Sequence, residues 1–181
     1  MELLSLLFGL LAVALYLLCF WLKTAKSIVA CRVLSSLFYV LQYLLLSAFV
    51  GAAMDAAALC CSYIAYRRDT GFVKRHKIPI LIFSYATIVT VGLLLYTGPI
   101  SLLAIVGVLF ESTSNWMRRE KVIRLVSLPA IPCWLIYNIA AGAYGAAIGS
   151  ALALISVIGA LIRYSRLERA EREAGKTAKT R

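Results

Sequence analysis

The sequence has little of what metal sites, disulfide frameworks and hydrolytic active sites require. It contains one histidine, His76, and five cysteines, all of which lie inside apolar segments. A cysteine in such a segment behaves as a small hydrophobic residue. Neither a Cys-x-x-Cys spacing nor a Cys/His cluster is present, so the sequence predicts no metal, no cofactor and no disulfide framework. Because no nucleophile–base pair or phosphate-binding loop appears either, we expect no enzyme.

Charged residues are scarce in the long apolar runs. The 181 residues are 62% hydrophobic and only 15% charged, and the mean hydropathy is +0.89. The runs are close to the roughly 17–25 residues that a helix needs to cross a bilayer. This predicts an all-α integral membrane protein. The first run, 3–22, lacks a basic leader and a small-residue cleavage site, so we expect a retained helix and not a signal peptide.

Seven membrane-spanning segments are predicted from the apolar runs. Their connections alternate between basic and uncharged, and all 19 basic residues fall in or next to connections on one side. Short loops rich in Lys and Arg mark the cytoplasmic side, which places the N-terminus outside and the C-terminus in the cytoplasm. The predicted spans are 3–22, 27–46, 49–66, 78–96, 99–114, 122–140 and 144–164.

The net charge of +11 therefore follows membrane topology and does not indicate a nucleic-acid surface. Arg32 and Arg124 lie in the first turns of their helices, and we expect both side chains to extend outward to solvent. The tail, 165–181, is predicted to continue the last helix briefly and then to fray. It serves either as a solvated end that fixes topology or as a binder of anionic lipid heads.

The chain repeats itself at a distance of 95 residues. LQYLLLSAFVGAAMDAAAL at 41–59 matches IYNIAAGAYGAAIGSALAL at 136–154, and span ends, basic loops and neutral turns stay in phase over three helices. Two three-helix units share one orientation only if an odd number of spans joins them. The prediction is a 3+1+3 fold of two parallel repeats, with units 1–68 and 98–164, a basic loop and linker helix at 69–97, and a basic cytoplasmic tail at 165–181.

Two equivalent helix faces are candidates for binding a small polar solute. Each combines aromatic rings with an amide or hydroxyl group at i, i+3, i+4 spacing, and such groups hydrogen-bond a solute and stack on its apolar face. An interfacial aromatic belt explains the same pattern equally well. The faces consist of Tyr39, Gln42 and Tyr43 in the second span and Trp134, Tyr137 and Asn138 in the sixth.

Asp55 lies about two turns into the third span, and its repeat partner is Ser150. An intramembrane acid is a functional candidate because it costs roughly 2.5–3.5 kcal/mol to insert, so Asp55 is predicted to bind the solute or to carry a proton. The alternative is a structural hydrogen bond near the outer interface. Glu111, the repeat partner of Tyr16, is assigned either to gating or coupling or to a structural pair with Arg118 or Lys121.

Small residues and prolines predict packing and bending. Gly145-x-x-x-Gly149 lets helices approach closely within a bundle; it does not by itself predict a dimer, and a homo-oligomer stays open. Pro129 and Pro132 in the sixth span predict a kink, either static or acting as a hinge.

Two segments carry a resemblance to a known family. They are RLVSLPAIPCWLIYNIAAGAYGAAIGSALALISVIGALIRY at 124–164 and LFYVLQYLLLSAFVGAAMDA at 37–56. Both resemble the YgjV-type bacterial inner membrane proteins, most specifically in WLIYN followed by a Gly-x-Tyr-Gly turn. The resemblance implies a location in the bacterial inner membrane.

The 3+1+3 arrangement is also similar to that of the SWEET and PQ-loop transporters, which pass sugars or amino acids between two bundles. Asn138 does not occupy the position of the SWEET substrate asparagines, and no Pro-Gln pair is present. The predicted function is transport of a small polar solute, sugar-like or amino-acid-like, by rocking of two bundles in the lipid bilayer, with proton coupling through Asp55 as a hypothesis. The alternative is a non-transporting scaffold or sensor that binds a lipid or a protein.

Overall fold

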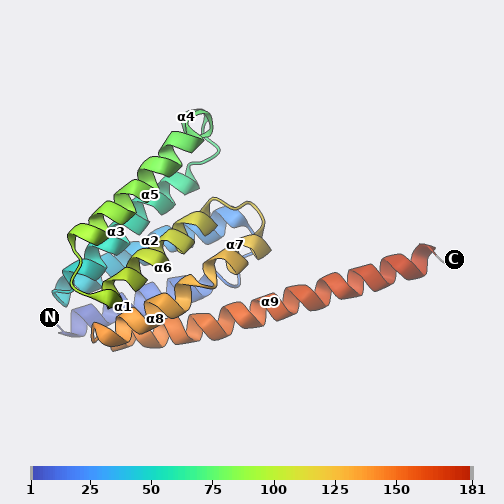
Figure 1. Cartoon of the computed structure of the whole chain (residues 1–181). Helices are drawn as coiled ribbons and strands as arrows, with labels where there is room; N and C mark the ends of the chain where they lie inside the picture. Colours follow the sequence, from blue (N-terminus) through green and yellow to red (C-terminus); the bar gives the residue numbers. More distant parts are fainter. Residues whose placement is uncertain (1, 180–181) are drawn as a thin grey trace.

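The computed structural model describes residues 2–179 of the chain, with side chains described for residues 3–166. Within this part every regular element is a helix and no strand occurs. The N-terminus and the C-terminus lie at opposite ends of the helix bundle (Figure 1). The helices are α1 (Glu2–Leu18), α2 (Ala25–Leu45), α3 (Phe49–Tyr66), α4 (Gly71–Arg75), α5 (Lys77–Leu94), α6 (Pro99–Asn115), α7 (Glu120–Ser127), α8 (Ala130–Ala140) and α9 (Tyr144–Lys179).

Four to five segments are long and apolar enough to cross a membrane. The four are α2, α3, α5 and the Tyr144–Arg166 part of α9, and α7 with α8 is the fifth if this bent pair forms one span. The apolar helices Leu3–Leu18 and Pro99–Asn115 are shorter than that length. The all-α membrane architecture is thus confirmed, while the number of seven spans stays a prediction.

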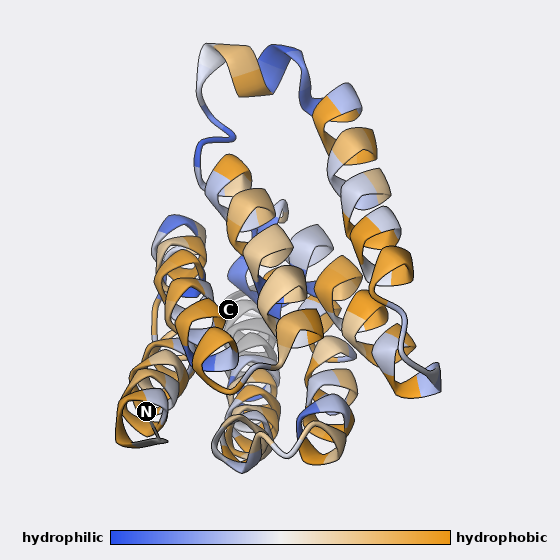
Figure 2. Ribbon diagram, turned by 90° about the vertical axis from the view of Figure 1, so that its left-hand side faces the viewer, coloured by the Kyte–Doolittle hydropathy of each residue, from blue (hydrophilic) through white to orange (hydrophobic). Residues whose placement is uncertain are grey.

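The outer surface of the bundle is apolar, as a lipid-facing surface must be. Phe83, Leu94 and Ile155 are 73%, 79% and 69% exposed. Figure 2 shows hydrophobic residues along the outward faces of the helices and hydrophilic residues concentrated in connections. In water such an exterior would be unstable, because apolar surface is transferred out of water favourably.

The sixth predicted span is divided in two at its prolines. α7 ends at Ser127, Pro129 is the N-cap of α8, and the two helices meet at 41°. Pro129 and Pro132 lack the amide hydrogens that would continue the hydrogen-bond ladder across this point. The predicted kink is therefore confirmed.

The turns after α2 and α8 have the same backbone geometry. Ser47 and Gly142, which are 95 residues apart, both adopt positive φ, at 56° and 71°. The amide of the next residue then bonds back five residues, from Ala48 to Tyr43 and from Ala143 to Asn138, at 2.9 Å in both cases. This is the Schellman cap, which satisfies carbonyl groups left free at a helix end.

The packing of the helices forms two groups of three. α1, α2 and α3 pack in succession, and so do α6, α8 and α9. Between the groups, α3 packs on α6 and α1 packs on α9, whereas α5 leans against α3 and α6 from outside (Figure 1). With an offset of 95 residues, α1 corresponds to α6 and α9 corresponds to α3. The α1–α9 contact therefore corresponds to the α6–α3 contact.

Three element boundaries differ from the sequence prediction. α1 ends at Leu18 and not near residue 22. The basic loop contains a short helix, α4, whose Val73 is buried. The prediction of a fraying tail was wrong, because α9 continues to Lys179. The segment after Arg163 is rich in Arg, Glu, Lys and Ala, which are strong helix formers.

Candidate functional site

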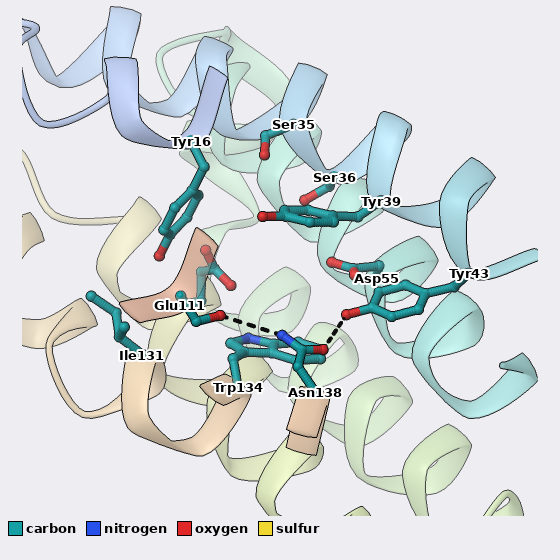
Figure 3. Close-up of a pocket in the computed structure, with 11 residues that line it drawn as sticks. Tyr16, Ser35, Ser36, Tyr39, Tyr43, Asp55, Glu111, Ile131, Trp134 and Asn138 are labelled. Carbon is teal, nitrogen blue, oxygen red and sulfur yellow. Dashed lines mark hydrogen bonds between the residues drawn. The ribbon is translucent and has the colours of Figure 1, made fainter. Parts of the chain in front are cut away.

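A small buried cavity of about 40 Å³ lies between the two helix groups. It has room for only a few water molecules, since each needs roughly 10–15 Å³ of such space. Figure 3 shows rings, hydroxyls and two carboxyl groups converging on it. The lining residues are Tyr16, Ser35, Ser36, Tyr39, Tyr43, Asp55, Glu111, Ile131, Trp134, Asn138 and Ser150.

Ten of these eleven lining residues form five pairs separated by 95 positions. A cavity placed on one side of the protein would collect residues from one group without regard to their counterparts. A cavity on the axis that relates two equivalent groups collects both members of each pair. The pairs are Tyr16 with Glu111, Ser36 with Ile131, Tyr39 with Trp134, Tyr43 with Asn138, and Asp55 with Ser150.

The two members of one of these pairs are joined by a hydrogen bond. The Tyr43 hydroxyl donates to Oδ1 of Asn138 (Figure 3). Asn138 Nδ2 donates to Ser150 Oγ at 3.3 Å, and Ser150 in turn donates to the Ala146 carbonyl at 2.9 Å. The chain joins α2 of one group to α8 and α9 of the other, and closes the cavity at the end nearest the uncharged turns.

The two carboxyl groups come from different helix groups. Asp55 on α3 is 6% exposed, and no side chain in the described part of the protein hydrogen-bonds to it. In Figure 3 it lies between the rings of Tyr39 and Tyr43, with Glu111 on α6 across the cavity. A buried carboxyl without a partner costs free energy, so its place beside a water-sized space is consistent with a role in binding.

Six of the eight predicted solute-binding residues line the cavity, and so does Glu111. They are Tyr39, Tyr43, Asp55, Trp134, Asn138 and Ser150. Gln42 and Tyr137 do not. Gln42 turns toward α1, where a Cβ on Gly9 would fall within 3.0 Å of its amide. Tyr137 packs edge-on against Trp134, with ring centroids 5.7 Å apart.

Tyr16, Ser35, Ser36 and Ile131 line the cavity but were not predicted. The sequence could have predicted two of them. Ser36 stands at i−3 and i−7 from Tyr39 and Tyr43 and so shares their face, and Tyr16 is the counterpart of Glu111. Of the two structural partners predicted for Glu111, Arg118 pairs with Asp69 at 3.1 Å, and a pair with Lys121 stays a prediction.

Two arginines join the helix groups at the opposite, basic end. The prediction that Arg32 and Arg124 extend to solvent was wrong, since each is 2% exposed. Arg32 Nη1 donates to Ser114 Oγ and to Asn115 Oδ1, the latter at 2.9 Å.

Arg124 Nη2 donates to the carbonyls of Phe20 and Leu22 at 3.1 and 2.9 Å. Arg32 in the first half of α2 thus reaches the end of α6 in the other group. In the same way, Arg124 on α7 reaches the segment that follows α1. Helix ends leave carbonyl groups unpaired, and those of Phe20 and Leu22 hold the Arg124 guanidinium in the protein, whereas side-chain oxygens of Ser114 and Asn115 hold that of Arg32.

One comparison with known proteins identifies a family. The family model described as Imp-YgjV, bacterial inner membrane protein, matches residues 3–168. The chain belongs to the Imp-YgjV family. The resemblance to YgjV-type proteins is thereby confirmed, and an inner-membrane location follows for this Imp-YgjV protein. No curated protein and no solved structure matches the chain, so the similarity to SWEET transporters stays a prediction.

Proposed function

We propose that this Imp-YgjV protein is a transporter or facilitator of a small polar solute and has no enzymatic activity. Its fold is a parallel 3+1+3 repeat, with α1–α3 and α6–α9 as the two bundles and α5 as the inverting helix. The observation that carries the proposal is the cavity, because ten of its eleven lining residues are five pairs offset by 95 positions. Transporters built from repeats bind solute at the repeat interface.

The helix packing supports the same arrangement. The contacts α1–α9 and α3–α6 exchange under the offset, as a two-fold axis along the membrane normal requires. The matched Schellman caps at Ser47 and Gly142 lie at equivalent turns. A seven-span topology needs α1 and α6 to cross as well; at 17 residues each, they are at the lower end of the range for spans.

The lining chemistry indicates the class of solute. Carboxyl groups, hydroxyls and the Asn138 amide hydrogen-bond polar groups, and the Trp134 and tyrosine rings stack on apolar ring faces or side chains. A sugar or an amino acid presents both kinds of surface. The acids Asp55 and Glu111 add the capacity to bind an ammonium group or to couple transport to protons.

The described conformation leaves little room for a solute. At about 40 Å³ the cavity is far smaller than the roughly 300–1,000 Å³ of ordinary small-molecule sites. The Tyr43–Asn138 bond joins the bundles at one end, and the bonds of Arg32 and Arg124 join them at the other. We infer that solute enters when the bundles rock apart and break one set of these hydrogen bonds at a time.

The distribution of charge supports an orientation with the N-terminus outside and the C-terminus in the cytoplasm. Basic connections and the tail occupy one end of the bundle, and the uncharged turns occupy the other. Lys and Arg in short loops remain on the cytoplasmic side. The arginine contacts then form the cytoplasmic closure, and the Tyr43–Asn138 bond forms the outer closure.

Accessibility of the cavity wall to water tests the proposal. Ser36→Cys and Ser150→Cys, each in a background with native cysteines replaced by alanine, are probed with a membrane-impermeant methanethiosulfonate in vesicles of both orientations. A transporter predicts labelling of both positions, from alternating sides as the bundles rock. The matched control is Ser127→Cys, which is 0% exposed and outside the cavity, and is expected to stay unlabelled.

Absence of labelling at both cavity positions contradicts transport and favours the alternative, a sealed scaffold or sensor.

Proton coupling has its own test, a screen of sugars and amino acids for transport currents in proteoliposomes. Any current-producing solute is then tested on Asp55→Asn. Loss of the current with retained solute exchange is expected, and an unchanged current removes the coupling role of Asp55.

A further inference from the structure

A second and larger pocket, of about 540 Å³, lies at the basic end of the protein, apart from the cavity. It is formed where the end of α1 and the start of α7 meet α9 (Figure 1). Its walls include Trp21, Lys23, Glu120, Arg124, Gly159 and Arg163. None of these residues belongs to the cavity between the bundles, so the pocket requires a separate explanation.

The pocket is cationic, and its cations are only partly neutralised. Lys23, Arg124 and Arg163 face a single carboxylate, Glu120, which already accepts a hydrogen bond from the Tyr164 hydroxyl. Nε and Nη1 of Arg124 are buried and have no hydrogen-bond partner, with Nη1 3.9 Å from the Glu120 carboxylate. A buried guanidinium with unsatisfied donors favours an anionic oxygen ligand.

The pocket has no open counterpart, because the equivalent place is filled. The positions offset by 95 from Trp21, Arg124 and Ala160 are Trp116, Val29 and Ala65, and these pack in an apolar cluster closed by Val73 of α4. The described part of α9 continues past the pocket as a helix and does not fold back over it (Figure 1).

Arg163 is left without a partner for the same reason. Its counterpart Arg68 donates to the carbonyls of Asn115 and Met117, both at 2.8 Å. The equivalent carbonyls at Phe20 and Leu22 accept from Arg124 instead. Arg163 and Lys23 consequently have no ion pair among the side chains that the structure describes, and both are free for a ligand.

Apolar side chains lie in and next to the cationic pocket. Trp21 lines it and is 75% exposed, and Ile158 and Ile162, which are adjacent in sequence to its lining residues Gly159 and Arg163, are 45% and 49% exposed on α9. Tryptophan is typical of the membrane–water interface. A ligand that suits this combination carries an anionic head and an apolar tail.

We propose that the pocket between α1, α7 and α9 binds the phosphate headgroup of an anionic phospholipid. Arg124 and Arg163 bind the phosphate oxygens, Lys23 adds charge, and the acyl chains lie along the outer face of α9. Basic pockets between membrane helices on the cytoplasmic side bind such headgroups. The proposal does not depend on transport, because the pocket shares no residue with the cavity.

Gly159 offers a variant that fills the pocket without disturbing the fold. A Cβ at this position has no heavy atom within 4 Å, so a larger side chain occupies open space. The test uses native mass spectrometry of purified protein titrated with phosphatidylglycerol or phosphatidylcholine. Gly159→Phe is compared with Ile155→Phe, a matched control on α9 that lies outside the pocket.

The wild type is expected to retain phosphatidylglycerol over phosphatidylcholine. Removing a basic residue near an anionic lipid surface costs about 1 kcal/mol, so K23Q and R163Q should each weaken phosphatidylglycerol binding about fivefold. Gly159→Phe should abolish the preference and Ile155→Phe should keep it.

Equal binding of the two lipids by the wild type, or an unchanged preference in Gly159→Phe, overturns the proposal. Full competition by an equal concentration of glycerol 3-phosphate overturns it too, since the ligand is then a free phosphate ester and not a lipid.

Discussion

The hydrogen bond between Tyr43 and Asn138 joins the two bundles at equivalent positions, and its strength can be predicted. Both side chains are almost fully buried, at 1% and 3% exposure. Tyr43→Phe leaves Asn138 Oδ1 without its donor, and Asn138→Leu removes the bonds to both Tyr43 and Ser150. A buried polar group without its partner costs about 1–3 kcal/mol, and side-chain hydrogen bonds between membrane helices average about 0.6 kcal/mol with a maximum near 1.7. Because both partners are buried, we expect a coupling energy of about 1–1.7 kcal/mol.

A double-mutant cycle measures that coupling directly. The two single variants and the double variant are unfolded by SDS in mixed micelles, and the loss of helical circular dichroism gives the free energy of unfolding of each. Tyr85→Phe with Thr113→Val serves as the control cycle, because its partly buried 3.0 Å bond joins α5 to α6 and does not connect the two bundles. A coupling energy below about 0.3 kcal/mol for the Tyr43–Asn138 cycle refutes the reasoning, since even an average membrane hydrogen bond exceeds it.

The remaining predictions use the same unfolding assay. Ser47→Gly should raise the free energy of unfolding by about 1 kcal/mol and Gly142→Ala should lower it by about 1 kcal/mol, because both positions adopt positive φ, where a Cβ is unfavourable; changes of the same sign would contradict the shared turn geometry. Arg32→Met should lower it by about 2–4 kcal/mol through loss of two charge-assisted hydrogen bonds, while the exposed Arg119→Met should stay within about 0.5 kcal/mol. An equal effect of the two arginine variants would show that the buried contact carries no stability.

Periodicity and charge predicted most of the fold. The apolar runs located the helices because a membrane helix must satisfy its own backbone within one continuous segment. The kink at Pro129 follows from a missing amide hydrogen, which is a property of the residue itself. Helix α4 was missed because its five residues are too few to show a periodic pattern. The continued α9 was missed because its helical state depends on the propensity of charged residues and not on an apolar run.

The candidate site was predictable in part, and its two errors have different causes. Tyr39 and Tyr43 were placed on a face together with Gln42, but successive residues on a helix point about 100° apart. Gln42 therefore turns to α1 while its neighbour Tyr43 turns to the cavity. The burial of Arg32 could not be predicted because its acceptors at the end of α6 are some eighty positions away in sequence.

Sided labelling of the connections tests the central claim, two parallel triplets joined by one inverting helix. Single cysteines replace Leu46 and Ala141 on the two uncharged turns and Arg67 on a basic connection, again with native cysteines removed. Intact cells are treated with an impermeant maleimide. The account predicts labelling at positions 46 and 141 in intact cells, and at position 67 only after permeabilisation. Labelling of 46 and 141 from opposite sides of the membrane would contradict it.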